Sequence, residues 1–151
     1  MIDIIEGGIA NDFRGQIRFV NHFDMSQIKR FYLITNANID VVRGWRAHRM
    51  EQRWFYVVSG TICIDFVKID DWIQPSIDLE IERRIMSAND SRILHLPSGY
   101  GAAFQSLKFN SELLVFSDYG IENAKNDDYA WPANYFVKRD GCIDVGQRDN
   151  E

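Results

Sequence analysis

Short apolar segments recur along the chain, separated by polar residues. They are rich in aromatic and β-branched side chains and lie at residues 17–20, 31–34, 54–58, 61–67, 79–85, 92–96 and 113–116. Segments of this length and composition predict β-strands. Ser59-Gly60 is short enough to join two of them as a hairpin, and Pro97-Ser98-Gly99 ends another with a turn. One helical turn is predicted at residues 26–29, where Ser26 is a candidate N-cap.

This spacing predicts an all-β fold. Many short strands with turns between them favour a sandwich or a barrel, whereas an α/β fold would alternate strands with long amphipathic helices. Barrels of this kind hold small ligands in the mouth or bore, where inward-facing polar side chains from several strands converge.

Length and composition predict one domain. A chain of 151 residues, 46% of them hydrophobic, is enough to bury one sizeable core. We expect the domain to span residues 1–137. Residues 138–151 are polar and charged with little to bury, so we expect a C-terminal appendage there.

The charge balance and the cysteines limit the partners. A net charge of −5 and a pI near 5.2 argue against nucleic-acid binding. No stretch approaches the roughly 20 apolar residues that span a bilayer, and the first residues lack a basic start followed by a long apolar run. Cys63 and Cys142 have neither CxxC nor metal-site spacing. We therefore expect no membrane partner, reduced structural cysteines and a cytoplasmic location.

Polar residues cluster at residues 41–60, on the approach to a strongly apolar strand. The cluster contains four arginines, one histidine, one glutamate and one glutamine. If the segment forms a strand, alternation places Arg46 and His48 on one face, and Trp45 and Ala47 on the other. Two polar groups side by side on an inward face are compatible with a functional site.

The same stretch resembles a known motif. Residues 43–48 (RGWRAH), followed by residues 52–55 (QRWF) and Gly60, resemble the first motif of cupins that modify nucleotide sugars. Two families share it: the dTDP-4-dehydrorhamnose 3,5-epimerases, and the dTDP-4-keto-6-deoxyglucose 3,4-ketoisomerases with their WxcM-like relatives. Residues 28–34 resemble the preceding ketoisomerase strand, and residues 96–104 (LPSGYGAAF) resemble the second epimerase motif. The resemblance covers residues 13–136 and implies a cupin-type double-stranded β-helix, or jelly-roll barrel.

The resemblance also implies an activity. Both families move protons next to the C4 ketone of a 4-keto-6-deoxyhexose, which requires a base near the carbon and a donor or cation near the enolate oxygen. His48 is the implied base. Arg46 beside it would keep the imidazole neutral by like-charge repulsion and would stabilise an enolate or a phosphate. Tyr32 and Tyr119 are candidate proton donors, and no redox cofactor is implied.

The nucleotide end of such a ligand requires cations and an aromatic face. The implied substrate-binding residues are Arg43, Arg53, Gln52, Arg30 and Tyr100, with Arg18 as a further cation and Trp45, Trp54 and Phe104 available to stack on the base. The chain has no glycine-rich phosphate loop and no dinucleotide fingerprint, which argues against a kinase or a nicotinamide enzyme.

The sequence departs from both families at two positions. Arg46 stands where the ketoisomerases carry the first histidine of an HxH pair and where the epimerases carry their basic histidine, and Ala102 replaces a frequent histidine of the second motif. Arginine stays protonated and cannot accept a proton. These departures keep a second hypothesis open: a degenerate cupin that binds a sugar nucleotide or a small anion without turnover.

The departures also argue against a metal site. The candidate metal ligands that are left are His48 and Glu51, and a positively charged guanidinium lies beside them. Structural roles remain open as well: a single strand histidine is often hydrogen-bonded structure, and Arg43 and Arg53 could be solvated residues at a strand edge. The resemblance further implies a homodimer, with residues 2–9 and 13–19 as the contributing segments.

Overall fold

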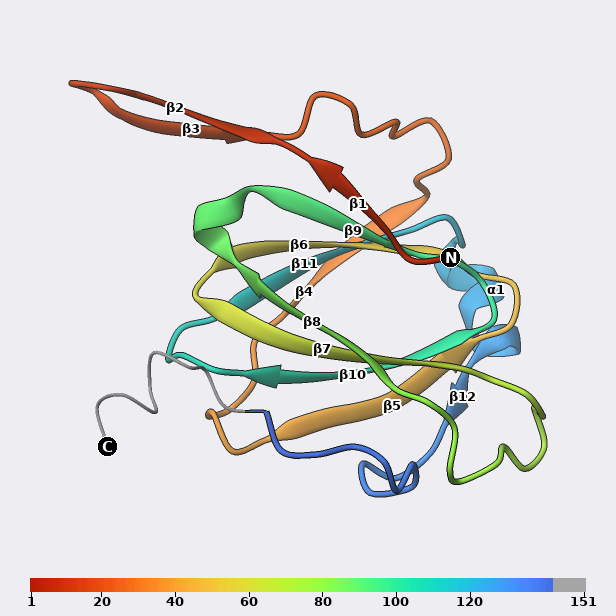
Figure 1. Ribbon diagram of the computed structural model, residues 1–151. Helices are drawn as coiled ribbons and strands as arrows, with labels where there is room; N and C mark the ends of the chain where they lie inside the picture. Colours follow the sequence, from red (N-terminus) through yellow and green to blue (C-terminus); the bar gives the residue numbers. More distant parts are fainter. Residues whose placement is uncertain (143–151) are drawn as a thin grey trace.

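The computed structural model describes residues 1–142, which form an antiparallel β-structure with only short helical turns (Figure 1). The strands are β1 (Asp3–Glu6), β2 (Gly8–Asp12), β3 (Gly15–Phe19), β4 (Arg30–Ile34), β5 (Val42–His48), β6 (Arg53–Ser59), β7 (Thr61–Lys68), β8 (Glu82–Ser87), β9 (Arg92–Leu96), β10 (Tyr100–Ser106), β11 (Glu112–Ser117) and β12 (Tyr129–Ala130). The helical turns are η1 (Ala88–Asp90), α1 (Ile121–Ala124) and η2 (Lys125–Asp127). No helix in this part of the chain has the length and hydropathy to cross a membrane.

Two five-stranded sheets face each other (Figure 1). The first has the strand order β1-β9-β6-β11-β4 and the second has the order β12-β5-β10-β7-β8. Strands β2 and β3 form a separate hairpin that projects away from the two sheets. The all-β prediction is confirmed.

At residues 26–29 a single turn forms, but it does not continue as a helix. The segment makes one hydrogen-bonded turn, in which the Ile28 amide donates to the Met25 carbonyl at 3.0 Å. The next amide, of Lys29, donates instead to the carbonyl of Ser117 at 2.8 Å, and Ser117 is the last residue of β11, the strand that pairs with β4. Pairing with the sheet therefore begins before a second helical turn can form.

The main core lies between the two sheets. Period-two alternation points one side of each strand inward, so Phe55, Ile64, Leu94 and Leu113 are completely buried. The Phe55 ring meets the Phe104 ring edge-on across the sheets, with centroids 5.3 Å apart. Each fully buried side chain of this size stabilises the fold by about 1.5–3 kcal/mol.

A second apolar cluster covers the outer face of β5, β10 and β7. Trp45 and Phe136 form its centre, with ring centroids 5.0 Å apart and near-perpendicular planes. The backbones of Trp45 and Trp131 exchange two hydrogen bonds of 2.8 and 3.0 Å. The C-terminal segment therefore holds β5 from outside, and β7 is buried on both faces.

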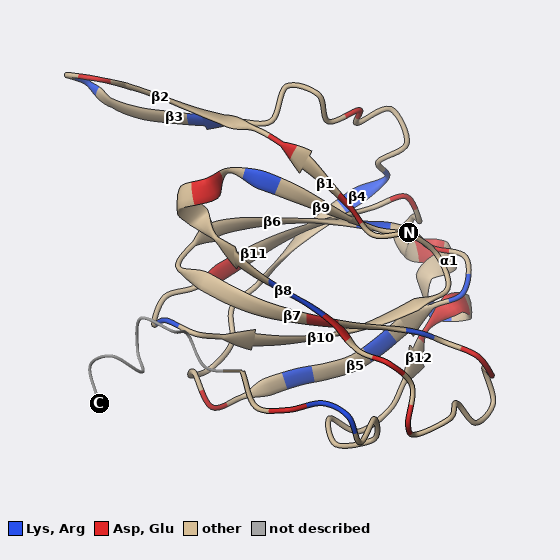
Figure 2. Cartoon of the chain, in the orientation of Figure 1, with Lys and Arg blue, Asp and Glu red and all other residues tan. Residues whose placement is uncertain are grey.

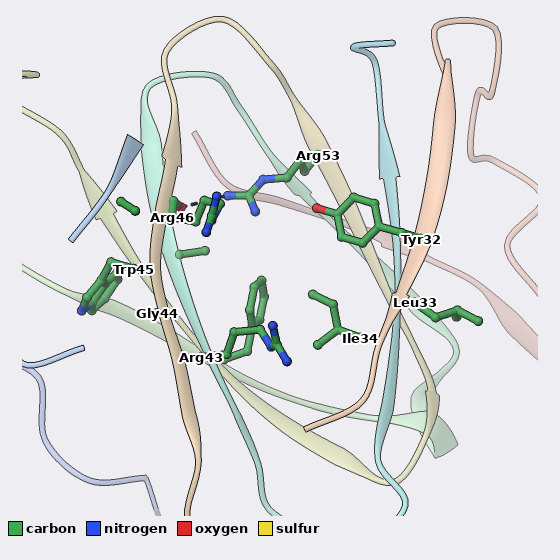
Figure 3. A pocket seen from close by; sticks show the side chains of 11 residues that line it. Tyr32, Leu33, Ile34, Arg43, Gly44, Trp45, Arg46 and Arg53 are labelled. Atoms are coloured by element: carbon green, nitrogen blue, oxygen red, sulfur yellow. Dashed lines mark hydrogen bonds between the residues drawn. The ribbon is translucent and has the colours of Figure 1, made fainter. Parts of the chain in front are cut away.

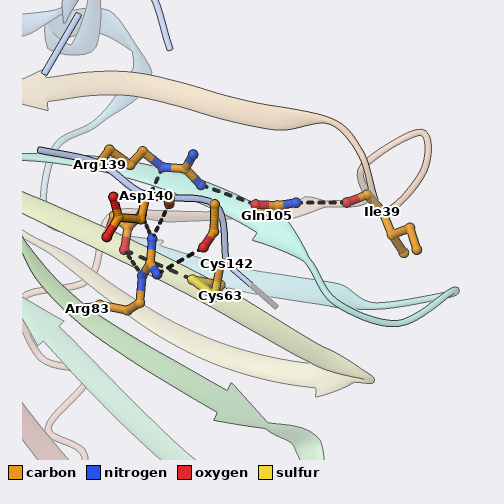
Figure 4. Close-up of a disulfide and its surroundings, with 9 residues drawn as sticks. Ile39, Cys63, Arg83, Gln105, Arg139, Asp140 and Cys142 are labelled. Carbon is orange, nitrogen blue, oxygen red and sulfur yellow. Dashed lines mark hydrogen bonds and ion pairs between the residues drawn. A yellow bond between two sulfur atoms is a disulfide. The ribbon is translucent and has the colours of Figure 1, made fainter. Parts of the chain in front are cut away.

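A disulfide joins Cys63 on β7 to Cys142, with Cα atoms 6.5 Å apart (Figure 4). The prediction of reduced cysteines is therefore wrong. Because 79 residues separate the two cysteines, their spacing in the sequence carried no sign of the pairing. The cytoplasmic location, which rested partly on reduced cysteines, stays a prediction.

The start of the expected C-terminal appendage packs against the sheet. Buried Asp65 accepts from Arg83 at 2.7 Å and pairs with Arg139 at 2.8 Å, next to the disulfide (Figure 4). Residues 138–142 are thus fixed by an ion-pair network and a covalent bond. Residues 143–151 of the predicted appendage lie outside the described residues.

Replacing Cys142 by serine is expected to lower the free energy of unfolding by roughly 2–4 kcal/mol, because the bond closes a long loop and restricts the unfolded chain. Urea denaturation of the oxidised wild type and the variant measures this loss. Cys63→Ser is the matched control and should lose the same amount, with no further loss in the double variant. Equal stability of wild type and both single variants would contradict the bond.

Candidate functional site

A pocket of about 410 Å³ opens between β4 of the first sheet and β5 of the second (Figure 3). Its size is that of a small-molecule site. The lining residues are Tyr32, Leu33, Ile34, Arg43, Gly44, Trp45, Arg46, Arg53, Ala102, Phe104 and Ala130. In Figure 3 the side chains of Leu33 and Trp45 point away from the pocket, so these residues form its wall with their backbones.

A bulge in β5 brings two of the arginines to the same side. Arg46 pairs with Ala102 on β10, but Phe104 pairs with Arg43, so β5 carries one extra residue between the two pairs. An extra residue reverses the alternation, and Arg43 therefore faces the pocket together with Arg46. Gly44 permits the close approach at this point, since a Cβ there would lie 2.5 Å from the Ala103 Cβ.

Arg53 is the most deeply placed cation of the pocket. Its residue is 3% exposed, and one guanidinium nitrogen donates to the Arg46 carbonyl at 3.3 Å. Its guanidinium carbon lies 5.4 Å from the centre of the Phe55 ring. Within residues 1–142 no carboxylate pairs with Arg53, and its guanidinium and the Tyr32 hydroxyl point toward the same space (Figure 3). A buried cation without a counter-ion is costly, and an anion in the pocket would offset that cost.

The other two arginines have different partners. One guanidinium nitrogen of Arg46 lies 2.7 and 2.6 Å from the two carboxylate oxygens of Asp128. Arg43 donates to the neutral side chain of Asn36 at 3.2 Å. Figure 2 shows the basic residues of β5 along this wall. The described lining includes three arginines and no Asp, Glu or His, so the pocket is cationic.

His48 lies beside the pocket but does not line it. The residue is 6% exposed, and its Nδ1 lies 2.6 Å from the Asp127 carbonyl oxygen, which can only accept, so Nδ1 carries the proton. Its Nε2 lies 3.1 Å from Oε2 of buried Glu51. The other Glu51 oxygen accepts from Ser117 at 2.7 Å and Arg30 at 3.2 Å. Both ring nitrogens therefore face protein oxygens.

Burial lowers the pKa of His48 below its usual 6.5, and the nearby Arg53 charge lowers it further, against the opposing effects of Glu51 and Asp127. Burial likewise lowers the pKa of His95. The unfolded chain then binds more protons than the folded chain in mild acid. The stability contributed by both groups is present above pH 6.5 and is lost as the pH falls through the folded pKa.

We therefore expect the free energy of unfolding to decrease between pH 7.5 and pH 5.5. The measurement is urea denaturation at the two pH values, a window above the ordinary range of carboxylates. The decrease should be smaller in His48→Gln, which cannot take up a proton there. A variant with the same pH dependence as wild type would show that His48 is not the group responsible.

Asp127 organises the loop that follows His48. Its carboxylate accepts from the backbone amides of Arg49, Met50 and Glu51 at 2.7–2.8 Å. Three such bonds to a buried carboxylate fix the loop and, through the Asp127 carbonyl, the His48 ring. Sequence reasoning missed this residue because it lies 79 positions after His48 in a segment without a recognisable motif.

The structure brings together four of the nine predicted site residues in the pocket: Tyr32, Arg43, Arg46 and Arg53. His48 and Arg30 belong to the buried network around Glu51. Tyr119 lines a separate shallow depression with Arg49 and Asp127. Tyr100 packs against the main core.

Gln52 points to the outer face of its sheet. Its Oε1 lies 2.7 Å from Nε2 of His95, and its Nε2 donates to Oδ2 of Asp118 at 3.3 Å. Trp54, expected as a stacking residue, lies on the same outer face and stacks on the His95 ring at 4.9 Å. Of the three predicted aromatic platforms, Phe104 alone offers its side chain to the pocket, because Trp45 packs in the outer cluster. In residues 1–142 no group of three or more His, Cys, Asp or Glu is arranged to hold a metal ion.

Several solved structures share this arrangement. The sugar 3,4-ketoisomerase QdtA from Thermoanaerobacterium thermosaccharolyticum, in complex with TDP, has a TM-score of 0.68 and 19% identity over 89% of this chain and 91% of its own. The 3'-monoepimerase ChmJ from Streptomyces bikiniensis, in complex with dTDP-quinovose, has a TM-score of 0.71 and 17% identity over 95% of this chain and 77% of its own. The TDP-quinovose 3,4-ketoisomerase WlaRB from Campylobacter jejuni has a TM-score of 0.65 and 17% identity over 91% of this chain and 98% of its own.

The chain has the fold of these proteins. The predicted cupin-type barrel is confirmed, and the likeness spans most of the described chain. No protein-family model matches the sequence, and no curated protein matches it either.

Proposed function

We propose that the pocket binds a dTDP-4-keto-6-deoxyhexose and that the protein is a sugar-nucleotide isomerase or epimerase that transfers protons next to the C4 ketone. The observation that supports this most is a buried arginine without a carboxylate partner, aimed into a pocket that holds two further arginines. The similar structures with TDP and dTDP-quinovose bound point to the same class of ligand.

Each pocket side chain has a task in this proposal. Arg53, desolvated and beside the Tyr32 hydroxyl, would stabilise the negative charge that develops on the enolate oxygen. The diphosphate would contact Arg53 through its terminal phosphate, and Arg43 and Arg46 through its other oxygens, because planar guanidinium donors suit phosphate. Phe104 offers an apolar surface to the sugar or base. No metal and no redox cofactor take part in this proposal.

The base would be His48, the motif histidine nearest the pocket. With Nδ1 protonated, its Nε2 must share a proton with Glu51 or release that contact to accept one from the sugar. A small ring rotation toward the pocket would therefore have to accompany turnover. Tyr32 is placed to donate on the pocket side.

The engagement of both His48 nitrogens favours a second candidate function. A cationic pocket whose described lining has no imidazole or carboxylate can bind a sugar nucleotide or a small anion and leave it unchanged. On this alternative the Glu51–His48 pair is structural and holds the motif loop.

Incubation with freshly made dTDP-4-keto-6-deoxyglucose in deuterated water separates the two. Deuterium entering C3 or C5 of the recovered sugar supports the isomerase or epimerase. Saturable binding without exchange supports the second candidate. Neither binding nor exchange would contradict both.

We further propose that the protein forms a homodimer. Apolar side chains are exposed on the hairpin and on edge strand β4, where Phe13 is 97%, Phe31 66% and Leu33 52% exposed. The β2–β3 hairpin projects from the barrel and offers a further surface. Strand β1 pairs with β9 of its own chain, so the β4 face and the hairpin are the proposed contacts.

Sedimentation at micromolar concentration should give twice the chain mass of 17.6 kDa. Phe31→Asp should yield the monomer, because a charge would be buried in the interface. Phe109→Asp, at another exposed phenylalanine away from β4 and the hairpin, should leave the dimer intact. A monomeric wild type would rule the proposal out.

A further inference from the structure

Asp128 occupies a position that an anionic ligand would need. Its carboxylate holds Arg46, a lining residue of the pocket, through two contacts of 2.6 and 2.7 Å to one guanidinium nitrogen. Both side chains are partly open to solvent, 56% for Arg46 and 37% for Asp128. The pair therefore lies at the accessible part of the pocket, in contrast to buried Arg53.

The backbone around Asp128 is held by the strand that follows it. Tyr129 and Ala130 of β12 pair with Ala47 and Arg46 of β5, and Ala130 itself lines the pocket. On the other side, Asp127 is tied to three backbone amides of the motif loop. Asp128 thus stands between two fixed residues, which keeps its backbone beside Arg46.

Asp128 and a ligand phosphate would compete for the same arginine. Three arginines line the pocket, and Asp128 is the one carboxylate that the described contacts place on any of them. A phosphate that binds Arg46 must displace Asp128 or accept its repulsion at close range. We infer that Asp128 is an internal counter-ion that competes with the ligand's phosphate for Arg46 and so sets the affinity of the pocket for anions. This inference rests on the proposed function only in assuming an anionic ligand.

Removing the competing charge should strengthen anion binding. The probe is inorganic pyrophosphate, titrated calorimetrically at low salt. Asp128→Asn should bind it roughly 1.5- to fivefold more tightly than wild type, the range expected for a partly exposed ion pair, and added salt should shrink the gain. Glu80→Gln is the matched control: it removes the carboxylate of an exposed pair with Lys138 outside the pocket lining and changes the net charge by the same amount.

A double-mutant cycle assigns the gain to Arg46. In an Arg46→Gln background, Asp128→Asn should have no effect. The inference is overturned when Asp128→Asn binds pyrophosphate no better than wild type, when Glu80→Gln gives the same gain, or when the gain persists without Arg46. The proposed function fails separately. If Asp128→Asn gains pyrophosphate affinity but the dTDP-sugar neither binds nor exchanges deuterium, the competition by Asp128 is supported and the sugar nucleotide is contradicted as the ligand.

Discussion

Arg53→Gln is expected to bind dTDP roughly 30- to 5,000-fold more weakly than wild type. Arg53 is buried and has no carboxylate partner in the described chain, so a phosphate or enolate oxygen would be its counter-ion. Truncating one partner of a desolvated charge pair typically costs about 2–5 kcal/mol, which corresponds to that loss of affinity. Isothermal titration with dTDP measures it.

The control for this variant is Arg18→Gln. Arg18 lies outside the pocket and donates to the carbonyls of Val58 and Ala88 at 2.8 and 3.1 Å, so it anchors the hairpin. The Arg18→Gln variant should bind dTDP with the affinity of wild type. Near-wild-type affinity in Arg53→Gln, with the fold intact by urea denaturation, would show that the unpaired guanidinium does not hold the ligand.

His48→Ala is expected to reduce deuterium exchange into the sugar by about 10²- to 10⁴-fold while leaving dTDP affinity within a few-fold of wild type. A positioned base contributes a rate factor of this size, and His48 does not line the pocket. Time-resolved mass spectrometry of the recovered sugar nucleotide measures the exchange.

His95→Ala is the matched variant for this test, because His95 is the other partly buried histidine and lies on the outer face against Trp54. Its exchange rate should equal that of wild type. Undiminished exchange in His48→Ala would identify another base and would make the Glu51–His48 pair structural.

The strand pattern could be predicted from the sequence because most strands alternate or are continuously apolar. β7 reads as an unbroken apolar run apart from Asp65, and the structure shows why: the C-terminal segment covers its outer face. β10 and β12 escaped prediction because β10 contains a run of small residues and β12 has only two residues, and their pairing comes from neighbours distant in the chain.

The site could be predicted only in part, for a related reason. Alternation correctly put Arg46 and His48 on one face of β5. It does not predict how deeply each side chain on that face is buried, and His48 lies in a buried network beside the pocket. Alternation also shows that Gln52 and Arg53 cannot both face inward, which the motif resemblance overlooked. Asp127 and Asp128 reach β5 by tertiary contact alone.

The structure of the complex with dTDP tests the central claim most directly. We predict the nucleotide in the pocket between β4 and β5, with oxygens of its diphosphate within hydrogen-bond distance of Arg53 and of Arg43 or Arg46, and with its terminal phosphate toward Tyr32. Density for the nucleotide at any other surface, with this pocket containing only solvent at saturating dTDP, would contradict it.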